Sequence, residues 1–223
     1  MSHTKKIFSI EGNIGAGKST LMSQLEKLMP DAVYLYEPVS QWKNKGGDDL
    51  LKAFYECPKR WCYTFELESM VSKVRRLSEA LKSDKEVIIM ERSIYSDLAF
   101  QQVGYLDGKL TSMEMKLLKE WRDDFLKGYP RFDAVFYLDT SVEKCLFRIK
   151  NRGRPEENNI SSEYLTKLED SFMTTKYDCP VIYIDGDDDI TPAPPASKSS
   201  PIKPPSPLPK KVLKYINKYK YLI

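Results

Sequence analysis

The chain contains 223 residues, of which 41% are hydrophobic and 30% charged, and its formal net charge is +3. This composition is ordinary for a globular protein, the charge gives no reason to expect a nucleic-acid partner, and no apolar run reaches the roughly 18 residues of a membrane span. The four cysteines lack metal-binding or disulfide spacing, and an apolar run begins at residue 6 without room for a targeting peptide, so we expect reduced thiols and a cytoplasmic location.

Five short apolar runs alternate with helical patterns along the chain, at residues 6–11, 32–36, 86–90, 134–138 and 181–184. Their near-continuous apolar character is typical of strands that are buried on both faces of a parallel sheet. Helix starts are marked by Pro58, by Thr111 with Glu114 as a capping box, and by Ser141. The sequence therefore predicts a doubly wound α/β fold, with a five-stranded parallel sheet flanked by helices and functional residues at the carboxyl ends of the strands.

The first strand leads directly into Gly-Asn-Ile-Gly-Ala-Gly-Lys-Ser-Thr at residues 12–20. A strand before it and an apolar-periodic helix after it are the context that the phosphate-loop pattern G-x-x-x-x-G-K-[ST] requires. Backbone N–H groups of such a loop bind phosphate oxygens, the lysine reaches the β- and γ-phosphates, and the hydroxyl ligates Mg²⁺. We expect a nucleoside triphosphate to bind here, through Gly12, Asn13, Ile14, Gly15, Ala16, Gly17, Lys18, Ser19 and Thr20.

Acidic residues follow the second and third predicted strands. Glu37 begins the sequence Glu-Pro-Val, and Glu91 begins Glu-Arg-Ser. A carboxylate at this position can accept the proton of an attacking hydroxyl, and another can hold Mg²⁺ or its waters. Because His3 is the only histidine, acid–base chemistry falls to these carboxylates. The residues leave open which of the two carboxylates is the base. We expect Glu91 to lie near the metal with Ser19. Arg92 is expected to counter the negative charge beside the nucleophile and the transferring phosphate.

Three arginines end a later helical pattern and precede Glu156 and Glu157. Arg148 and Arg152 are four residues apart and share a helix face. With Arg154 they form a cationic rim, and arginine suits this position because its planar fork grips phosphate oxygens. The pattern predicts that the rim closes over a triphosphate, although a solvated basic helix end would read the same way.

Together with Tyr55 and residues 60–66, which open a long helical pattern, these clusters occur in an order that resembles the deoxynucleoside kinase family over about residues 6–190. The resemblance implies a kinase domain at residues 1–190, ATP as phosphate donor, and the 5′-hydroxyl of a deoxyribonucleoside as acceptor, in nucleotide salvage. It also implies a homodimer, and a mobile arginine-rich lid that bends at Gly153. The expected catalytic residues are Glu37, Glu91, Arg92 and Arg154, with Arg148 and Arg152 on ATP.

The same resemblance implies a nucleoside site. Glu37 contacts the 5′-hydroxyl and is favoured as the base, while Tyr55 and Glu157 hold the 3′-hydroxyl. Aromatic side chains offer an apolar slot for the nucleobase, although ordinary core aromatics would look alike in sequence. The expected substrate contacts are Glu37, Trp42, Tyr55, Phe65, Glu66, Lys73, Arg92, Asp97 and Glu157, with Phe100 in the apolar slot.

Glu66 stands where family members carry a glutamine that pairs with the base. An ionised carboxylate only accepts hydrogen bonds, and guanine offers two adjacent donors, so Glu66 predicts a bias towards deoxyguanosine unless it keeps its proton or Lys73 neutralises it. Lys73 lies seven residues later on the same helix face. With Asp97, the two form either a base-reading group or a structural ion pair.

The end of the chain differs in composition. Residues 191–209 contain eight of the 14 prolines, which predicts a disordered insertion; a tolerated surface insertion is favoured over a docking segment for an SH3-type partner. Residues 210–223 are expected to form a helical segment that packs on the kinase domain through Val212, Tyr215 and Ile216.

Two other functions stay open at this point. A thymidylate-type nucleoside monophosphate kinase would share the sheet and the phosphate loop, but its acceptor phosphate calls for an arginine after the strand-2 acid. Here Pro-Val-Ser-Gln-Trp follows Glu37. A catalytically degenerate family member with a structural role should have lost Lys18, Glu37 or the lid arginines, all of which are present.

Overall fold

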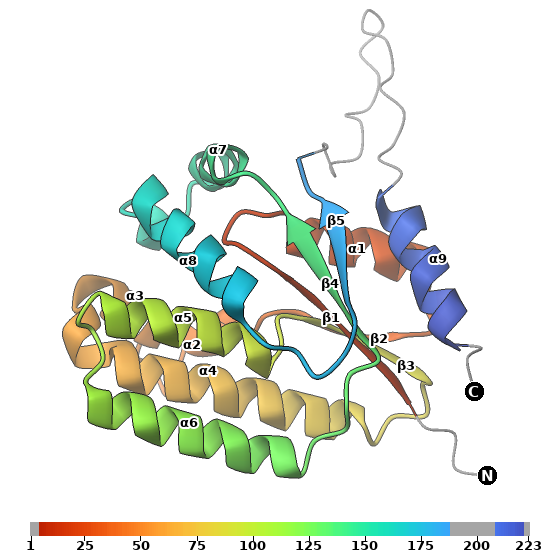
Figure 1. The fold of residues 1–223 in the computed structure, drawn as a ribbon, viewed down its shortest axis with the longest axis horizontal. Coiled ribbons are helices and arrows are strands. Elements are labelled where there is room, and N and C mark those ends of the chain that lie inside the picture. The colour runs from red at the N-terminus through yellow and green to blue at the C-terminus, as the bar shows by residue number, and fades with distance from the viewer. Residues whose placement is uncertain (1–4, 188–207, 221–223) are drawn as a thin grey trace, which may run out of the picture.

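The computed structural model describes residues 5–187 and 208–220, which form a five-stranded sheet with helices on both faces (Figure 1). All strands are parallel and lie in the order β2-β3-β1-β4-β5. The strands are β1 (Lys6–Gly12), β2 (Val33–Leu35), β3 (Val87–Glu91), β4 (Ala134–Asp139) and β5 (Val181–Asp185). The predicted doubly wound α/β fold and its five strands are confirmed, and the carboxyl ends of β1, β2 and β3 meet at one edge.

Helices cover the two faces unequally. Helices α4, α5 and α6 form a layer on one face, and α1 and α9 lie together on the other (Figure 1). The helices are α1 (Lys18–Leu28), α2 (Val39–Trp42), α3 (Leu50–Glu56), α4 (Pro58–Ala80), α5 (Ile94–Leu106), α6 (Ser112–Lys127), α7 (Val142–Arg152), α8 (Ser162–Thr174) and α9 (Leu208–Lys220), with a 3₁₀ turn at Pro155–Glu157.

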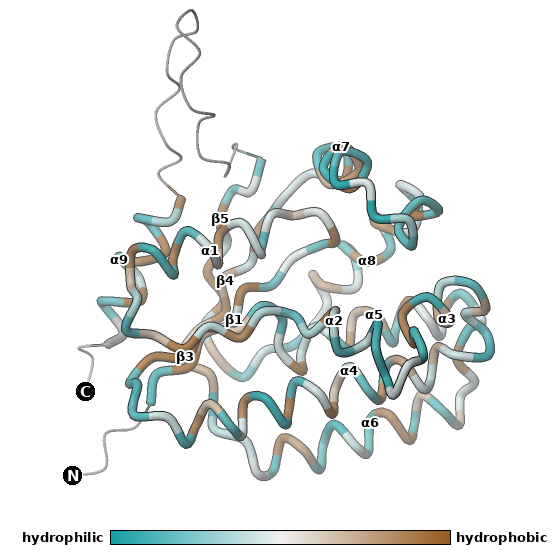
Figure 2. The backbone as a smooth tube through the Cα atoms, turned by 180° about the vertical axis from the view of Figure 1, so that it is seen from behind, coloured by the Kyte–Doolittle hydropathy of each residue, from teal (hydrophilic) through white to brown (hydrophobic). Residues whose placement is uncertain are grey.

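The core follows from the alternation of side chains along the strands. Phe8 and Phe136 point to one face and pack in a cluster with Leu21 of α1. Ile7 and Ile88 point to the other face and pack in a cluster that reaches α4. The central strands are accordingly brown in the hydropathy colours of Figure 2. Among residues 5–187 and 208–220, no helix combines the length and apolar character that a membrane crossing needs.

Local signals set the helix starts. Thr111 and Glu114 form the predicted capping box of α6, the Ser141 hydroxyl caps α7, and Pro58 is the first residue of α4. The prediction that Tyr55 belongs to the same long helix was wrong, because α3 ends before Cys57. Cys57 precedes a proline and takes φ −138° and ψ 73°, which lies outside the helical region that a following proline disfavours.

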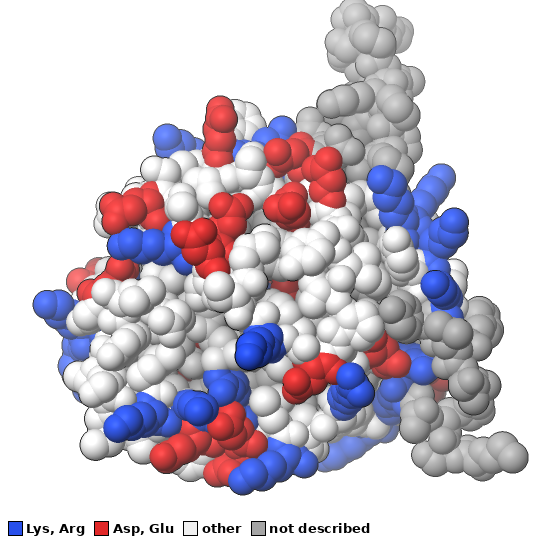
Figure 3. Space-filling view, viewed as in Figure 1, with Lys and Arg blue, Asp and Glu red and all other residues white. Residues whose placement is uncertain are grey.

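The C-terminal helix begins earlier than the composition suggests. Leu208 and Pro209, the last residues of the predicted proline-rich insertion, are buried in α9, and the rest of that insertion lies outside the described residues. Val212 and Ile216 are fully buried. Tyr215 is 42% exposed, with its ring centroid 6.4 Å from that of Phe136. On the face seen in Figure 3, basic side chains gather beside α9, and both signs are interspersed elsewhere.

Candidate active site

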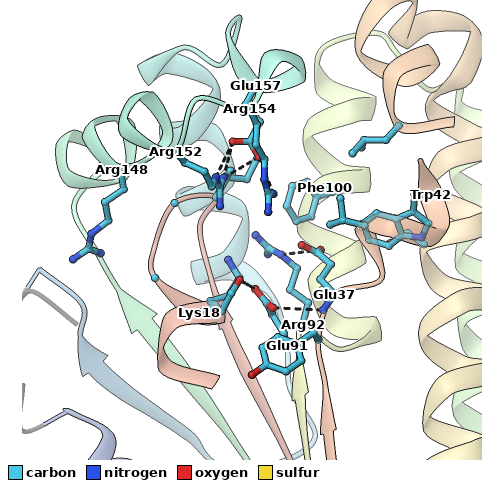
Figure 4. A pocket seen from close by; sticks show the side chains of 18 of the residues that line it. Lys18, Glu37, Trp42, Glu91, Arg92, Phe100, Arg148, Arg152, Arg154 and Glu157 are labelled. Atoms are coloured by element: carbon cyan, nitrogen blue, oxygen red, sulfur yellow. Dashed lines mark hydrogen bonds and ion pairs between the residues drawn. The ribbon is translucent and has the colours of Figure 1, made fainter. Parts of the chain in front are cut away.

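A cavity of about 720 Å³ opens where the phosphate loop, the ends of β2 and β3, and the helices α3, α4, α5 and α7 come together (Figure 4). It collects nearly all residues singled out in the sequence. Those that line it are Ile14, Gly15, Gly17, Lys18, Ser19, Thr20, Glu37, Trp42, Tyr55, Phe65, Glu66, Lys73, Glu91, Arg92, Asp97, Phe100, Arg148, Arg152, Arg154 and Glu157.

Three residues of the predicted phosphate loop do not line the cavity; they are Gly12, Asn13 and Ala16. Asn13 supports the loop from behind, because its Nδ2 donates to the carbonyl of Leu165 at 2.8 Å and its Oδ1 accepts from the N–H of Ile14 at 2.9 Å. The Ala16 side chain is fully buried. These residues shape the loop instead of facing a ligand with their side chains.

The glycines of the loop are required by close approach. Gly12 has φ +133°, and a Cβ there would lie 2.7 Å from the carbonyl oxygen of Leu138. Gly15 has φ +79°, and its Cβ would lie 2.5 Å from the carbonyl oxygen of Cys145 on α7. Only glycine adopts such angles without strain, so the loop can pack against β4 and α7 while its N–H groups turn inward.

Lys18 is buried at the start of α1, and its Nζ donates to the carbonyl of Asn13 at 2.7 Å. Burial, and next the nearby charge of Arg92, lower the pKa of Lys18 to about 8, while Glu91 and Glu37 oppose this shift. A bound anion would favour the charged ammonium. Lys18 can thus bind phosphate oxygens in its charged form.

Glu91 ends β3 beside the phosphate loop. Its Oε1 accepts a hydrogen bond from the Ser19 hydroxyl at 2.6 Å, and its Oε2 accepts from the N–H of Glu37 at 3.5 Å. Two adjacent hard oxygens fit Mg²⁺, which binds through one or two protein oxygens together with phosphates and waters. No cluster of three or more acidic, histidine or cysteine ligands occurs in the described part of the chain, so an all-protein cage for a metal is absent there.

Glu37 and Arg92 lie next to each other in the cavity wall and form an ion pair, with Glu37 Oε1 3.2 Å from Arg92 Nε (Figure 4). The Arg92 guanidinium also lies over the ring of Phe100, 4.7 Å from its centroid. Arg92 takes φ +60°, and no other non-glycine residue in the described ranges has a positive φ. Such strain persists only where surrounding contacts hold the backbone.

Those contacts come from Glu11, which the sequence analysis missed. This fully buried carboxylate in β1 accepts from the N–H and the hydroxyl of Ser93, at 2.8 Å and 2.6 Å, and from the hydroxyl of Ser96. The N–H of Arg92 donates to the carbonyl of Ile10 at 3.1 Å. An acidic residue inside an otherwise apolar strand was the available signal, because a buried charge needs donors.

The lid residues are paired with each other. Arg152 Nη2 donates to both carboxylate oxygens of Glu157, at 2.8 Å and 2.6 Å, and Arg154 lies 3.3 Å from the same group. Gly153 ends α7 at φ +65° between them. Arg148 Nη1 donates to the carbonyl of Ala16 at 2.9 Å, so α7 is tied to the phosphate loop. Glu157, predicted to hold a sugar hydroxyl, is here bound by the two arginines.

Aromatic side chains from α2, α3 and α4 line another part of the cavity. Phe65 lies between Trp42, in an edge-on arrangement at 5.2 Å, and Phe54, stacked at 4.7 Å. The indole of Trp42 donates to the Ser72 hydroxyl at 3.1 Å. Lining residues that the sequence analysis missed, mainly because they are ordinary apolar or polar types without a motif, are Tyr36, Val39, Leu51, Phe54, Ser69, Lys144, Phe147, Asn151 and Tyr164.

The three charged residues of the predicted base-reading group are buried together. Lys73 pairs with Asp97, whose Oδ1 also accepts from the Ser69 hydroxyl at 2.8 Å. Glu66 is 3% exposed and lines the cavity next to this pair. Burial, and next the charge of Asp97, raise the pKa of Glu66 well above its usual range.

Comparisons with known proteins agree with this fold. The family model for deoxynucleoside kinase matches residues 8–199. A protein named probable deoxycytidine kinase from fowlpox virus is 35% identical over 84% of this chain and 81% of its own length. The mitochondrial deoxyguanosine kinase of Xenopus laevis is 35% identical, with coverages of 77% and 74%, and human deoxycytidine kinase is 37% identical, with 74% and 72%.

The chain therefore belongs to the deoxynucleoside kinase family. It is an ATP-dependent phosphotransferase with a phosphate-loop kinase fold.

Proposed function

We propose that this chain transfers the γ-phosphate of ATP to the 5′-hydroxyl of a deoxyribonucleoside, in nucleotide salvage. The observation that carries the proposal is the shared cavity, which both Glu37 and Lys18 line, with Glu91 between the two (Figure 4) and its Oε1 accepting from the Ser19 hydroxyl. An acceptor hydroxyl and a triphosphate can meet there in line, which is what phosphoryl transfer requires.

The phosphate loop and Lys18 bind the triphosphate, and the arginines of α7 and the lid neutralise its charge. Ser19 and Glu91 would hold Mg²⁺, which supplies positive charge to the β- and γ-phosphate oxygens. Glu37 orients the 5′-hydroxyl and receives its proton as the new bond to the γ-phosphorus forms and the bond to the leaving ADP oxygen breaks.

Glu37 suits the role of base better than Glu91. Both oxygens of Glu91 accept hydrogen bonds and its side chain is buried. The Glu37 side chain is 24% exposed, and its Oε1 lies 3.2 Å from Arg92 Nε. An ionised carboxylate with room for an alcohol beside it is what a general base needs.

The test is ADP release with each of the four deoxynucleosides and their monophosphates as acceptors. Glu37→Gln should lower kcat by about 10²- to 10⁴-fold, the usual contribution of a general base, with little change in the KM for ATP. Glu91→Gln should instead raise the Mg²⁺ concentration needed for half-maximal rate. Glu56→Gln, on exposed α3 surface, is the matched control.

Turnover with monophosphates alone would replace this function with that of a nucleoside monophosphate kinase. No turnover with any acceptor would favour a catalytically degenerate family member. Equal rates for wild type and Glu37→Gln would remove Glu37 as the base.

We also propose that two copies of the chain form a homodimer, as the family resemblance implies. An apolar stripe on α6 suits this contact, because Met113, Leu117 and Trp121 recur every fourth residue and are 65%, 37% and 46% exposed. Sedimentation equilibrium of the wild type and of Leu117→Glu tests this, and a monomeric wild type at micromolar concentration would contradict it.

Base preference depends on the charge of Glu66. The ionised form would favour deoxyguanosine through the two adjacent donors of guanine, whereas a neutral carboxyl both donates and accepts and does not exclude the other bases.

A further inference from the structure

The base-facing end of the cavity contains two carboxyl groups and one cation. Lys73 is paired with Asp97, and both side chains are at most 4% exposed. Glu66, one turn before Ser69 and Met70 on α4, is 3% exposed and makes no ion pair or hydrogen bond with any described residue. Its carboxyl lines the cavity, where a ligand can supply its partner.

Only one of the two carboxyls is compensated. Burial raises the pKa of Asp97, but its Oδ1 atom accepts from Lys73 and from the hydroxyl of Ser69, and both contacts oppose this shift by favouring the ionised form. An ionised Glu66 beside it would be a second, unpaired buried charge, and an unpaired buried charge is strongly destabilising. The proton of the pair is consequently expected on Glu66.

The other ionisable groups around Glu66 do not change this balance. Arg92, the second nearby cation, is directed to Glu37 at 3.2 Å. Burial and the charge of Asp97 raise the pKa of Glu66 well above its usual range, against the smaller opposing effects of Lys73 and Arg92. The groups that face Glu66 are Cys62 and Lys73 from α4, Asp97 from α5, Tyr164 from α8, and Glu37 and Arg92 from the strand ends.

We propose that Glu66 recognises the nucleobase as a neutral carboxylic acid, so that bases with an amino group beside a ring-nitrogen acceptor, cytosine and adenine, are accepted. The acid hydroxyl donates to the ring nitrogen, and the acid carbonyl accepts from the amino group. Loss of the proton turns Glu66 into an acceptor only, which repels that ring nitrogen and leaves guanine with its two donors. This inference rests on the kinase function proposed above, and it makes base selection dependent on pH.

The kinetic test compares kcat/KM for deoxycytidine with kcat/KM for deoxyguanosine between about pH 6 and pH 8.5, below the range in which guanine itself ionises. In the wild type the ratio should fall with rising pH, by up to tenfold per pH unit above the pKa of Glu66. In Glu66→Gln the ratio should be flat, because an amide does not titrate. Ionisation of Glu37 or Lys18 affects both substrates and cancels in the ratio.

A matched control is Glu68→Gln on the same helix, since Glu68 pairs with Lys45 outside the cavity. Its ratio should follow the wild-type curve. A wild-type ratio that is flat with pH, or a wild type that rejects deoxycytidine and deoxyadenosine at every pH, would overturn the proposal.

Infrared difference spectra give a readout without turnover. At neutral pH the carbonyl stretch of a protonated carboxyl should be present in the wild type and in Glu68→Gln, and absent in Glu66→Gln. Carboxylate bands alone at this position would overturn the proposal. If no deoxynucleoside is phosphorylated by any variant, the kinase function fails, whereas the infrared band and calorimetric binding of deoxycytidine still decide the state of Glu66.

Discussion

Replacing Glu11 by glutamine should destabilise the protein, because this residue is a buried charge on which three donors converge. Glu11 is fully buried in β1 and accepts from the N–H and the hydroxyl of Ser93 and from the hydroxyl of Ser96. Ser93 is also the N-cap of α5, so the carboxylate lies at the positive end of that helix. The amide would lose the charge and turn an N–H₂ group towards at least one of these donors.

The size of the effect follows from the contacts. A hydrogen bond to a charged group contributes about 1.5–3 kcal/mol, and leaving a buried donor unsatisfied costs about 1–3 kcal/mol. Because the amide keeps one accepting oxygen, we expect the free energy of unfolding to fall by about 3 kcal/mol. For a domain of this size that corresponds to a Tm lower by roughly 6–12 °C.

Urea denaturation followed by tryptophan fluorescence, together with thermal melts, measures this change. Ser96→Ala is the matched control, because it removes one donor and leaves Glu11 with Ser93; it should cost about 1.5 kcal/mol, the lower end of the range for a bond to a charged group. The double variant should be less destabilised than the sum of the two, since both changes act on one network. A Glu11→Gln protein within about 0.5 kcal/mol of the wild type would refute the reasoning, because surface substitutions do as much.

Two further predictions concern the phosphate loop. Burial lowers the pKa of Lys18 to about 8 from the 10.5 of an ordinary lysine, so the unfolded chain binds the extra proton between these values and stability should rise with pH in that window. Bound ATP favours the ammonium form of Lys18, so ATP binding above about pH 8 should be accompanied by uptake of a proton, and the affinity for ATP should fall by up to tenfold per pH unit. Calorimetry in two buffers of different ionisation enthalpy measures this uptake. Binding without proton uptake would contradict the prediction. Gly15→Ala should lower stability by about 2–4 kcal/mol, because the new Cβ meets the backbone of Cys145 at 2.5 Å as well as incurring strain. Gly46→Ala is the control, because Gly46 has φ +66° and a Cβ there would have nothing within 4 Å; this variant should lose about 1–2 kcal/mol of stability from backbone strain alone. An equal loss of stability in both variants would show that the phosphate loop shifts to avoid the contact with Cys145.

Several features of the fold could be predicted from the residues because they have local causes. Continuous apolar runs such as residues 87–90 mark buried parallel strands, and the hydroxyl of Thr111 with Glu114 marks a helix start. The glycine pattern of residues 12–17 predicts a phosphate loop, because the positive φ angles of this loop are readily adopted only by glycine. Glu37 and Glu91, at the ends of the second and third predicted strands, were expected to lie close together because the carboxyl ends of parallel strands meet at one edge of the sheet.

Other features depend on partners that are distant in sequence. Glu11 is 82 residues from the N–H that it binds. Glu157, for which the family resemblance implied a sugar contact, is paired with Arg152 and Arg154. Tyr55 belongs to α3 and not to α4, because Cys57, the residue before Pro58, leaves the helical conformation and separates the two helices.

Glu66 shows most clearly where sequence reasoning stops. The residue type departs from the family at the position that is expected to face the base, but the charge of Glu66 depends on its burial and on which carboxyl Lys73 binds. The sequence by itself determined the order of strands along the chain, the phosphate loop and the chemical types gathered at the site, because these follow from local backbone preferences and hydrophobic patterns. Only the tertiary structure decided which carboxyls are paired, buried or open to a ligand, because ionisation responds to surroundings that the folded packing of distant segments creates.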